Sequence, residues 1–195
     1  MKKRFGDRIE PQEVRTIKGA PQCLPDTRFR ATHLQFRRWI GCPICNDHIA
    51  HFRRRHDAIA AAGIREVMFF HSTAEEILAF DSAMPFEMVG DAERVYYRQF
   101  GVERSWLFLA RWRAIAGAAR GLAAGKFAFA NNRGIDGLPA DILLSNAGVV
   151  VAAHYGEDAA DHWSVDELIA TARVAEQLHP HHFAAAPAGA PAQAR

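Results

Sequence analysis

The chain is poor in cysteine, nearly balanced in charge and without long apolar runs. Three cysteines in 195 residues are too few, and odd in number, for a disulfide framework, which indicates a reducing compartment. A formal net charge of +2 gives no electrostatic reason for binding nucleic acid. No segment reads as a membrane span, and the basic start Lys2-Lys3-Arg4 is not followed by the apolar stretch of a secretion signal. We therefore predict a cytoplasmic protein with neither nucleic acid nor a membrane as partner.

The apolar content, 49% of the residues, is enough to build one sizeable core. Residues 1–28 are polar and interrupted by proline and glycine, which predicts an N-terminal arm. Residues 29–178 carry successive strand and helix patterns and are expected to form one α/β domain. Residues 179–195 consist mainly of Ala, Pro and His, so we expect a mobile tail there.

The motif Cys42-Pro43-Ile44-Cys45 is the strongest indication of chemistry. It follows an apolar run and precedes a helical pattern that begins near Asp47, so we expect a dithiol at a strand-to-helix turn. Free N–H groups and the positive dipole end at a helix N-terminus stabilise a thiolate. Cys42 is therefore predicted to be the more acidic, attacking sulfur, and Cys45 the sulfur that resolves the intermediate. Cys23 is interpreted as a small apolar structural residue.

Zinc binding is the main alternative for this pair. Cys42, Cys45, His48 and His51 are spaced as a C-x2-C-x2-H-x2-H string. On one continuous helix, Cys42 and His51 are separated by a rise of roughly 13 Å, whereas ligands of one tetrahedral ion lie within about 4 Å of one another. These four residues cannot share an ion, and we expect no metal. A site made by both cysteines and more distant histidines stays open as a less favoured interpretation.

The remaining pattern orders the domain. Apolar runs predict strands at 29–39, 65–71, 84–89, 141–145 and 149–154, the last two joined by an Asn146-Ala147-Gly148 turn. Capping boxes predict helices that start at Ser72, with Glu75, and at Ser164, with Glu167. Residues 105–124, rich in Ala and Arg, read as an inserted helix. An amphipathic helix lying on its own domain explains its aromatic and arginine content better than a nucleic-acid or membrane surface does.

This order of strand, C-P-x-C, helix, strand and helix resembles a thioredoxin-like fold, with a central mixed sheet and helices on both faces. The segment from His33 to Cys45, with Phe69-Phe70-His71-Ser72, Met84-Pro85-Phe86 and the run from Tyr96 to Val102, is similar to peroxiredoxin-like proteins of the alkyl hydroperoxide reductase and thiol-specific antioxidant superfamily. The resemblance covers roughly residues 12–178. It implies that Cys42 is the peroxidatic or attacking cysteine and that Cys45 is its partner. It also implies that Pro139 is a cis-proline facing the dithiol.

The positions that hold proline and threonine before the active cysteine in typical peroxiredoxins are Gln35 and Trp39 here. Arg37 or Arg38 is a candidate for supplying positive charge to the thiol, and strand alternation allows only one of them to face it. A solvated arginine is the alternative for each. Trp39 and Pro43 belong to the environment of the motif. His71, at the carboxyl end of its strand, is a candidate proton donor or acceptor, with a structural histidine as the alternative.

The leading hypothesis is a dithiol oxidoreductase that reduces a peroxide or a disulfide without a bound cofactor. An external thiol reductant, such as a thioredoxin or glutathione system, would reset the pair, and a homodimer is possible. The rival hypothesis is a noncatalytic thioredoxin-fold module in which the segment Trp106 to Leu122 forms a dimer or partner surface.

Overall fold

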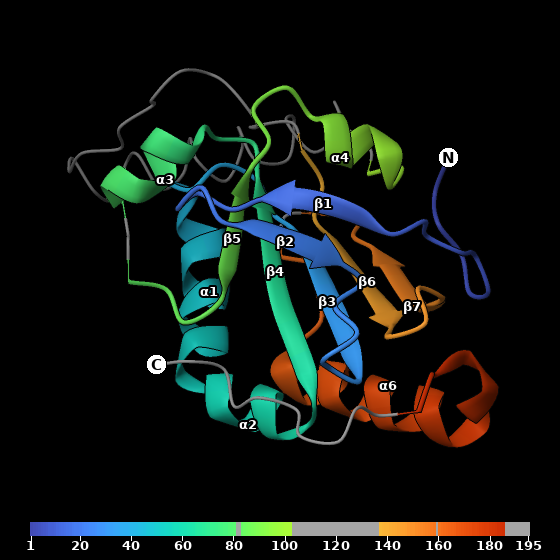
Figure 1. Ribbon diagram of the computed structural model, residues 1–195. Helices are drawn as coiled ribbons and strands as arrows, with labels where there is room; N and C mark the ends of the chain where they lie inside the picture. Colours follow the sequence, from blue (N-terminus) through green and yellow to red (C-terminus); the bar gives the residue numbers. More distant parts are fainter. Residues whose placement is uncertain (81–82, 103–136, 159, 186–195) are drawn as a thin grey trace.

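The computed structural model describes residues 1–80, 83–102, 137–158 and 160–185. Its centre is a five-stranded sheet in the order β5-β4-β3-β6-β7 (Figure 1). The strands are β3 (Ala31–Phe36), β4 (Ile64–Phe70), β5 (Glu87–Gly90), β6 (Ala140–Ser145) and β7 (Val150–Tyr155). β3 is parallel to β4 and antiparallel to β6, while β4 and β5 are parallel and β6 and β7 antiparallel. The predicted mixed sheet of a thioredoxin-like fold is confirmed.

Helices cover both faces of this sheet, as expected. They are α1 (Pro43–Arg54), α2 (His56–Ala61), α3 (Ala74–Phe80), α4 (Val95–Gln99) and α6 (Val165–Leu178), with a 3-10 turn, η1 (Pro180–His182), after α6. One apolar cluster joins residues of α1, α2, α3 and α6 to one face of the sheet. A second cluster joins Tyr97 of α4 to the opposite face. The predicted inserted helix at 105–124 lies outside the described residues.

The N-terminal arm forms a separate two-stranded antiparallel sheet, β1 (Gln12–Arg15) with β2 (Pro21–Leu24). Figure 1 shows this hairpin lying across β4 and β3. Val14 and Leu24 are fully buried against the second cluster. Cys23 is exposed, because alternation along β2 turns it away from the side that buries Leu24. The interpretation of Cys23 as a structural apolar residue is therefore wrong.

Two helix starts test the predicted capping boxes. At α6 the Ser164 hydroxyl accepts a hydrogen bond from the Glu167 N–H at 3.2 Å, and Ser164 N–H donates to the Glu167 carboxylate at 2.8 Å, as predicted. At α3 the box is one residue later than predicted, between Thr73 and Glu76. The Ser72 hydroxyl instead accepts the Ile40 N–H at 3.2 Å, so it fixes the loop that leads to the dithiol.

No helix among the described residues is long and apolar enough to cross a membrane.

Candidate active site

The dithiol lies where the sequence places it, at the start of α1. Cys42 is the N-cap residue, with extended backbone at φ −70° and ψ 116°, and Pro43 opens the first turn. Proline suits this position because its fixed φ matches a helix and its missing N–H has no partner to lose there. Cys42 N–H donates to the Trp39 carbonyl at 3.0 Å, which closes the turn before the helix. Both Cys42 and Cys45 are free thiols, and both are buried.

Arg38 is the cation that faces the attacking sulfur. Its Nη1 lies 3.7 Å from Cys42 Sγ, and its side chain is fully buried. Its guanidinium carbon lies 4.7 Å from the centre of the Trp39 ring, a cation–π contact that holds the side chain in place. A buried guanidinium beside sulfur favours the thiolate, because the low dielectric strengthens the attraction between the two charges.

Cys45 is set up to keep its proton. The pKa of Cys45 is raised well above its ordinary value by its hydrogen bond with Cys42, by burial and by negative charge on Cys42. The charge of Arg38 and a hydrogen bond with the Arg38 backbone oppose this rise and are outweighed. The arrangement therefore divides the pair into an anionic Cys42 and a protonated Cys45, which are the two states needed for attack and resolution.

Arg37 turns the other way and belongs to a buried network of charges. Its Nη2 donates to Asp141 Oδ1 at 2.6 Å and to Gln35 Oε1 at 2.6 Å, and lies 2.9 Å from His48 Nε2. Strand alternation thus sends one arginine to the dithiol and its neighbour to the opposite side, as expected. Neither arginine is solvated, because both are fully buried.

Two carboxylates and an imidazole complete this network. His33 Nδ1 lies 2.9 Å from Glu66 and its Nε2 lies 3.0 Å from Asp141, and all three side chains are buried. Burial lowers the pKa of His33, but the charge of Glu66 and hydrogen bonds with Asp141 and Glu66 outweigh it and raise the pKa to about 9. Burial likewise raises the pKa of Asp141, and the charge of Arg37 with the His33 hydrogen bond outweighs it, so the net shift is downward. At neutral pH two cations therefore face two anions.

The sequence analysis missed this network, although β3 carries a signal for it. His33, Gln35 and Arg37 recur at every second position, so they share one face of the strand. Their partners come from β4 and β6, where Glu66 pairs in register with His33 and Asp141 pairs with Gln35. A polar residue at every second position of an otherwise buried strand predicts a paired polar row, because isolated buried charges are too costly.

The network reaches a cavity of about 380 Å³ between α1 and the start of α6, where His48 and His162 form part of the wall. Their rings are 3.7 Å apart between centroids. Burial and the charge of Arg37 lower the pKa of His48, so its imidazole is neutral and can accept a hydrogen bond from Arg37. The cavity thus gives the buried charges a route for exchanging protons with solvent.

His71 lies beside the backbone that carries the two arginines. Its N–H donates to the Arg38 carbonyl at 3.0 Å, and its ring centre is 3.9 Å from that of Tyr97. The Tyr97 hydroxyl donates to the carbonyls of Arg37 and, at 2.8 Å, Phe69. His71 and Tyr97 therefore hold the segment between β3 and the dithiol.

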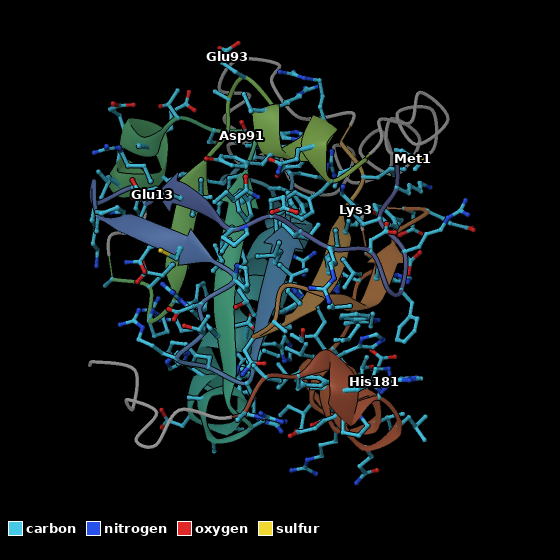
Figure 2. The ribbon with its side chains drawn as sticks, turned by 45° about the vertical axis from the view of Figure 1, so that its right-hand side comes forward. Met1, Lys3, Glu13, Asp91, Glu93 and His181 are labelled. Atoms are coloured by element: carbon cyan, nitrogen blue, oxygen red, sulfur yellow. The ribbon has the colours of Figure 1, made fainter. Side chains whose placement is uncertain are left out.

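Tyr97 is a second residue of the site that the sequence analysis did not single out. Burial, the charge of Asp91 and the charge of Cys45 raise the pKa of Tyr97 well above its ordinary value, so it acts as a hydrogen-bond donor at any physiological pH. Asp91 accepts the N–H groups of Val95, Tyr96 and Tyr97 at 2.7, 2.8 and 3.2 Å. Figure 2 shows Asp91 beside the start of α4, where this cap sets the helix that carries Tyr97.

The prediction of a cis-proline at Pro139 is wrong. Within the described residues, the cis peptide bond is Leu24–Pro25, and Leu138–Pro139 is not cis. The Pro139 carbonyl accepts the Gly156 N–H at 2.9 Å, which continues the pairing of β6 with β7. Pro139 therefore leads into β6 as ordinary extended backbone, and its carbonyl is already paired within the sheet.

Comparison with known proteins finds a shared fold. No family model matches the chain, and no curated protein matches its sequence. Three solved structures are similar. The first is peroxidoxin BcpB from Mycobacterium tuberculosis, with a TM-score of 0.62 and 18% identity over 87% of this chain and 96% of that one. The second is a reduced 2-Cys peroxiredoxin from Plasmodium vivax, with a TM-score of 0.61 and 14% identity over 91% and 82%. The third, from Chlorobium tepidum, is described as a thiol:disulfide interchange protein DsbE, with a TM-score of 0.55 and 17% identity over 88% and 97%. The chain has the thioredoxin-like fold of these proteins.

Proposed function

We propose that the protein is a thiol-dependent oxidoreductase of the peroxiredoxin-like kind, in which Cys42 attacks and Cys45 resolves. The observation that carries the proposal is the contact of 3.7 Å between Arg38 Nη1 and Cys42 Sγ at the start of α1. It puts a buried cation and a helix N-terminus on the same sulfur. The hydrogen bond between Cys45 and Cys42 supports the second role.

With a hydroperoxide, the Cys42 thiolate forms a bond to one oxygen while the O–O bond breaks, giving a sulfenic acid and, after protonation of the leaving oxygen, an alcohol or water. The Cys45 sulfur then attacks Cys42, a water leaves, and an intramolecular disulfide remains. An external dithiol, or two thiols of a glutathione system, reduces this disulfide and is itself oxidised. Every step uses residues of this chain and thiol chemistry, so no cofactor is needed.

Burial of both sulfurs favours a small substrate. Cys42 is 0% exposed and Cys45 is 2% exposed, so a protein disulfide would have to displace part of the surface before its sulfur could be attacked. A hydroperoxide needs only a narrow path. We therefore place a peroxide ahead of a protein disulfide as substrate, and a cytoplasmic location, with its pool of reducing thiols, as the setting.

The remaining residues of the site act as positioning residues. The Trp39 carbonyl and Pro43 shape the turn at Cys42, while His71 and Tyr97 fix the backbone of Arg37 and Arg38. Arg37 anchors the same segment from the other face through Asp141.

The test is peroxide consumption beside protein-disulfide reduction, with dithiothreitol as reductant. Cys42→Ser should abolish turnover, and Cys45→Ser should leave a sulfenic acid on Cys42 that a dimedone probe traps. Cys23→Ser is the matched control, because this exposed thiol lies in β2, outside the site, and its loss should leave the rate unchanged. Parent-like turnover in both Cys42→Ser and Cys45→Ser would leave a noncatalytic module as the better account.

A further inference from the structure

Three histidines follow α6 in the segment Leu178-His179-Pro180-His181-His182-Phe183. They lie away from the dithiol, which sits at the start of α1, and Figure 2 shows His181 beyond the end of α6. The sequence analysis assigned these residues to the tail and expected no metal ligands in the chain. In the structure, the backbone here forms the turn η1, with His179 as its N-cap residue.

The turn gathers the three imidazoles. His182 N–H donates to the His179 carbonyl at 3.0 Å, which closes one turn of 3-10 helix. Side chains three residues apart are eclipsed in a 3-10 helix, so His179 and His182 project to the same side. Their ring centres are 5.8 Å apart, and the His181 ring is 4.2 Å from that of His182. One ring nitrogen from each histidine lies within 4.8 Å of the other two.

Contacts on both sides hold this turn. After it, Ala184 N–H donates to the Asn146 side chain at 2.8 Å, and Arg30 lies over the Phe183 ring at 5.2 Å. From the N-terminal arm, Phe5 packs on the rings of His179 and His182 with centroid distances of 4.6 and 5.3 Å. The histidines are therefore presented by a fixed backbone, which reduces the entropy lost when they bind a ligand together.

We propose that His179, His181 and His182 bind one divalent transition-metal ion, with Zn²⁺ as the reference ion, through one imidazole nitrogen each. Three imidazoles are an established donor set for zinc, and water completes the tetrahedron. Nitrogens around a tetrahedral zinc ion with bonds of about 2.0 to 2.1 Å lie about 3.3 Å apart. The three nitrogens need to close by about 1.5 Å from their present 4.8 Å limit. Side-chain rotation can supply this, because His181 is exposed and the other two are half-buried.

The protonation state of one ligand supports this site. Burial and the charges of His181, His179 and Arg8 lower the pKa of His182. Its imidazole is therefore neutral near pH 7, which is the form that binds a metal. The same neighbours would repel a second proton, whereas a bound cation would be held by three lone pairs.

The experiment is titration of the full-length protein with Zn²⁺ by calorimetry at pH 7.5, repeated with Co²⁺, whose visible absorption reports its ligands. One equivalent should bind. His182→Gln and His179→Gln should each weaken binding more than about tenfold. His51→Gln is the matched control, because His51 is an exposed histidine on α1 and its replacement should change nothing. Cys42→Ser with Cys45→Ser should also leave binding unchanged.

Several outcomes would overturn the proposal. One is an absence of binding up to a millimolar concentration of Zn²⁺; another is binding that survives the double variant His179→Gln with His182→Gln. Binding lost in the cysteine variant but kept in the histidine variants would assign the ion to the thiols instead. The histidine variants should melt at the parent temperature without metal, since these side chains are partly solvent-facing, and only the parent should gain stability from Zn²⁺.

Discussion

The two faces of β3 are built from opposite kinds of residue, although both are buried. Leu34 and Phe36 project into an apolar cluster with α4 and the N-terminal hairpin. His33, Gln35 and Arg37 project toward α1 into a network of charges. The apolar face contributes stability by removing surface from water. The charged face costs desolvation, so its value lies in fixing one arrangement of β3, β4, β6 and α1 beneath the dithiol.

Removing one charge from the network should have the largest effect. Asp141 accepts bonds from His33, Arg37 and the Trp163 backbone, so Asp141→Ala leaves two buried cations with one carboxylate. We expect the free energy of unfolding to fall by about 3 to 5 kcal/mol, measured by urea denaturation.

Asp161→Ala is the matched control for that change. Asp161 also pairs with a histidine, His154, at 2.7 Å, but both side chains are about one-third exposed. Its loss should cost less than about 1 kcal/mol. Equal losses for the two variants would show that burial does not distinguish them.

The charged face should also make stability depend on pH. The pKa of His33 is about 9 in the folded protein, above the ordinary value of 6.5, because Glu66 and Asp141 outweigh the effect of burial. Its contribution is fully present below about pH 6.5 and is lost as the pH rises through about 9, an effect of about 3 kcal/mol. Urea denaturation between pH 6 and 10 should show this decline.

Because the thiols titrate in the same range, this series should use Cys42→Ser with Cys45→Ser. His33→Gln in that background should remove most of the decline, whatever it does to the absolute stability. A slope that persists in His33→Gln would assign the pH dependence to another group.

The two adjacent arginines allow a sharper test. Arg38→Met removes the cation that faces Cys42 and should slow the reaction of Cys42 with hydrogen peroxide about tenfold, or about 1.4 kcal/mol in activation free energy, with a small loss of stability. Arg37→Met breaks the contact with Asp141 and should lower stability first. Stopped-flow fluorescence and urea denaturation measure the two effects. If Arg37→Met slowed the reaction more than Arg38→Met at equal stability, the assignment of the arginines would be reversed.

The smallest effect is expected on the apolar face. Ile142→Val removes one methylene group from a fully buried side chain of β6, and should cost about 0.5 to 1.5 kcal/mol by urea denaturation. The loss should be the same at pH 6 and pH 9, since no titrating group is involved. A loss that changed with pH would mean that the two faces are coupled through the sheet.

The sequence predicted what neighbouring residues determine. The dithiol turn at Cys42 and the capping box at Ser164 depend on residues within one helical turn, and both are present. The box predicted at Ser72 formed one residue later, because the hydroxyl of Ser72 bonds instead to Ile40, which is distant in sequence. Local pattern alone could not reveal that competing partner.

The missed features depend on contacts between distant segments. His33 meets Glu66 and Asp141 only after β3 has paired with β4 on one side and β6 on the other. The cis-proline prediction rested on resemblance, and the backbone of this chain pairs Pro139 with Gly156 instead. The three histidines after α6 gave only a compositional signal, which did not reveal the turn that gathers them.

The N-terminal arm affects how two copies of the chain could associate. Gly6 N–H donates to the Val150 carbonyl at 2.9 Å, and Val150 N–H donates to the Asp7 carbonyl at 2.8 Å. These bonds occupy polar groups at the beginning of β7, an outer strand that another molecule could otherwise extend by strand addition. A second copy that paired with this stretch would first have to peel the arm away. The arm thus guards this part of the edge against aggregation and directs any homodimer toward a different surface.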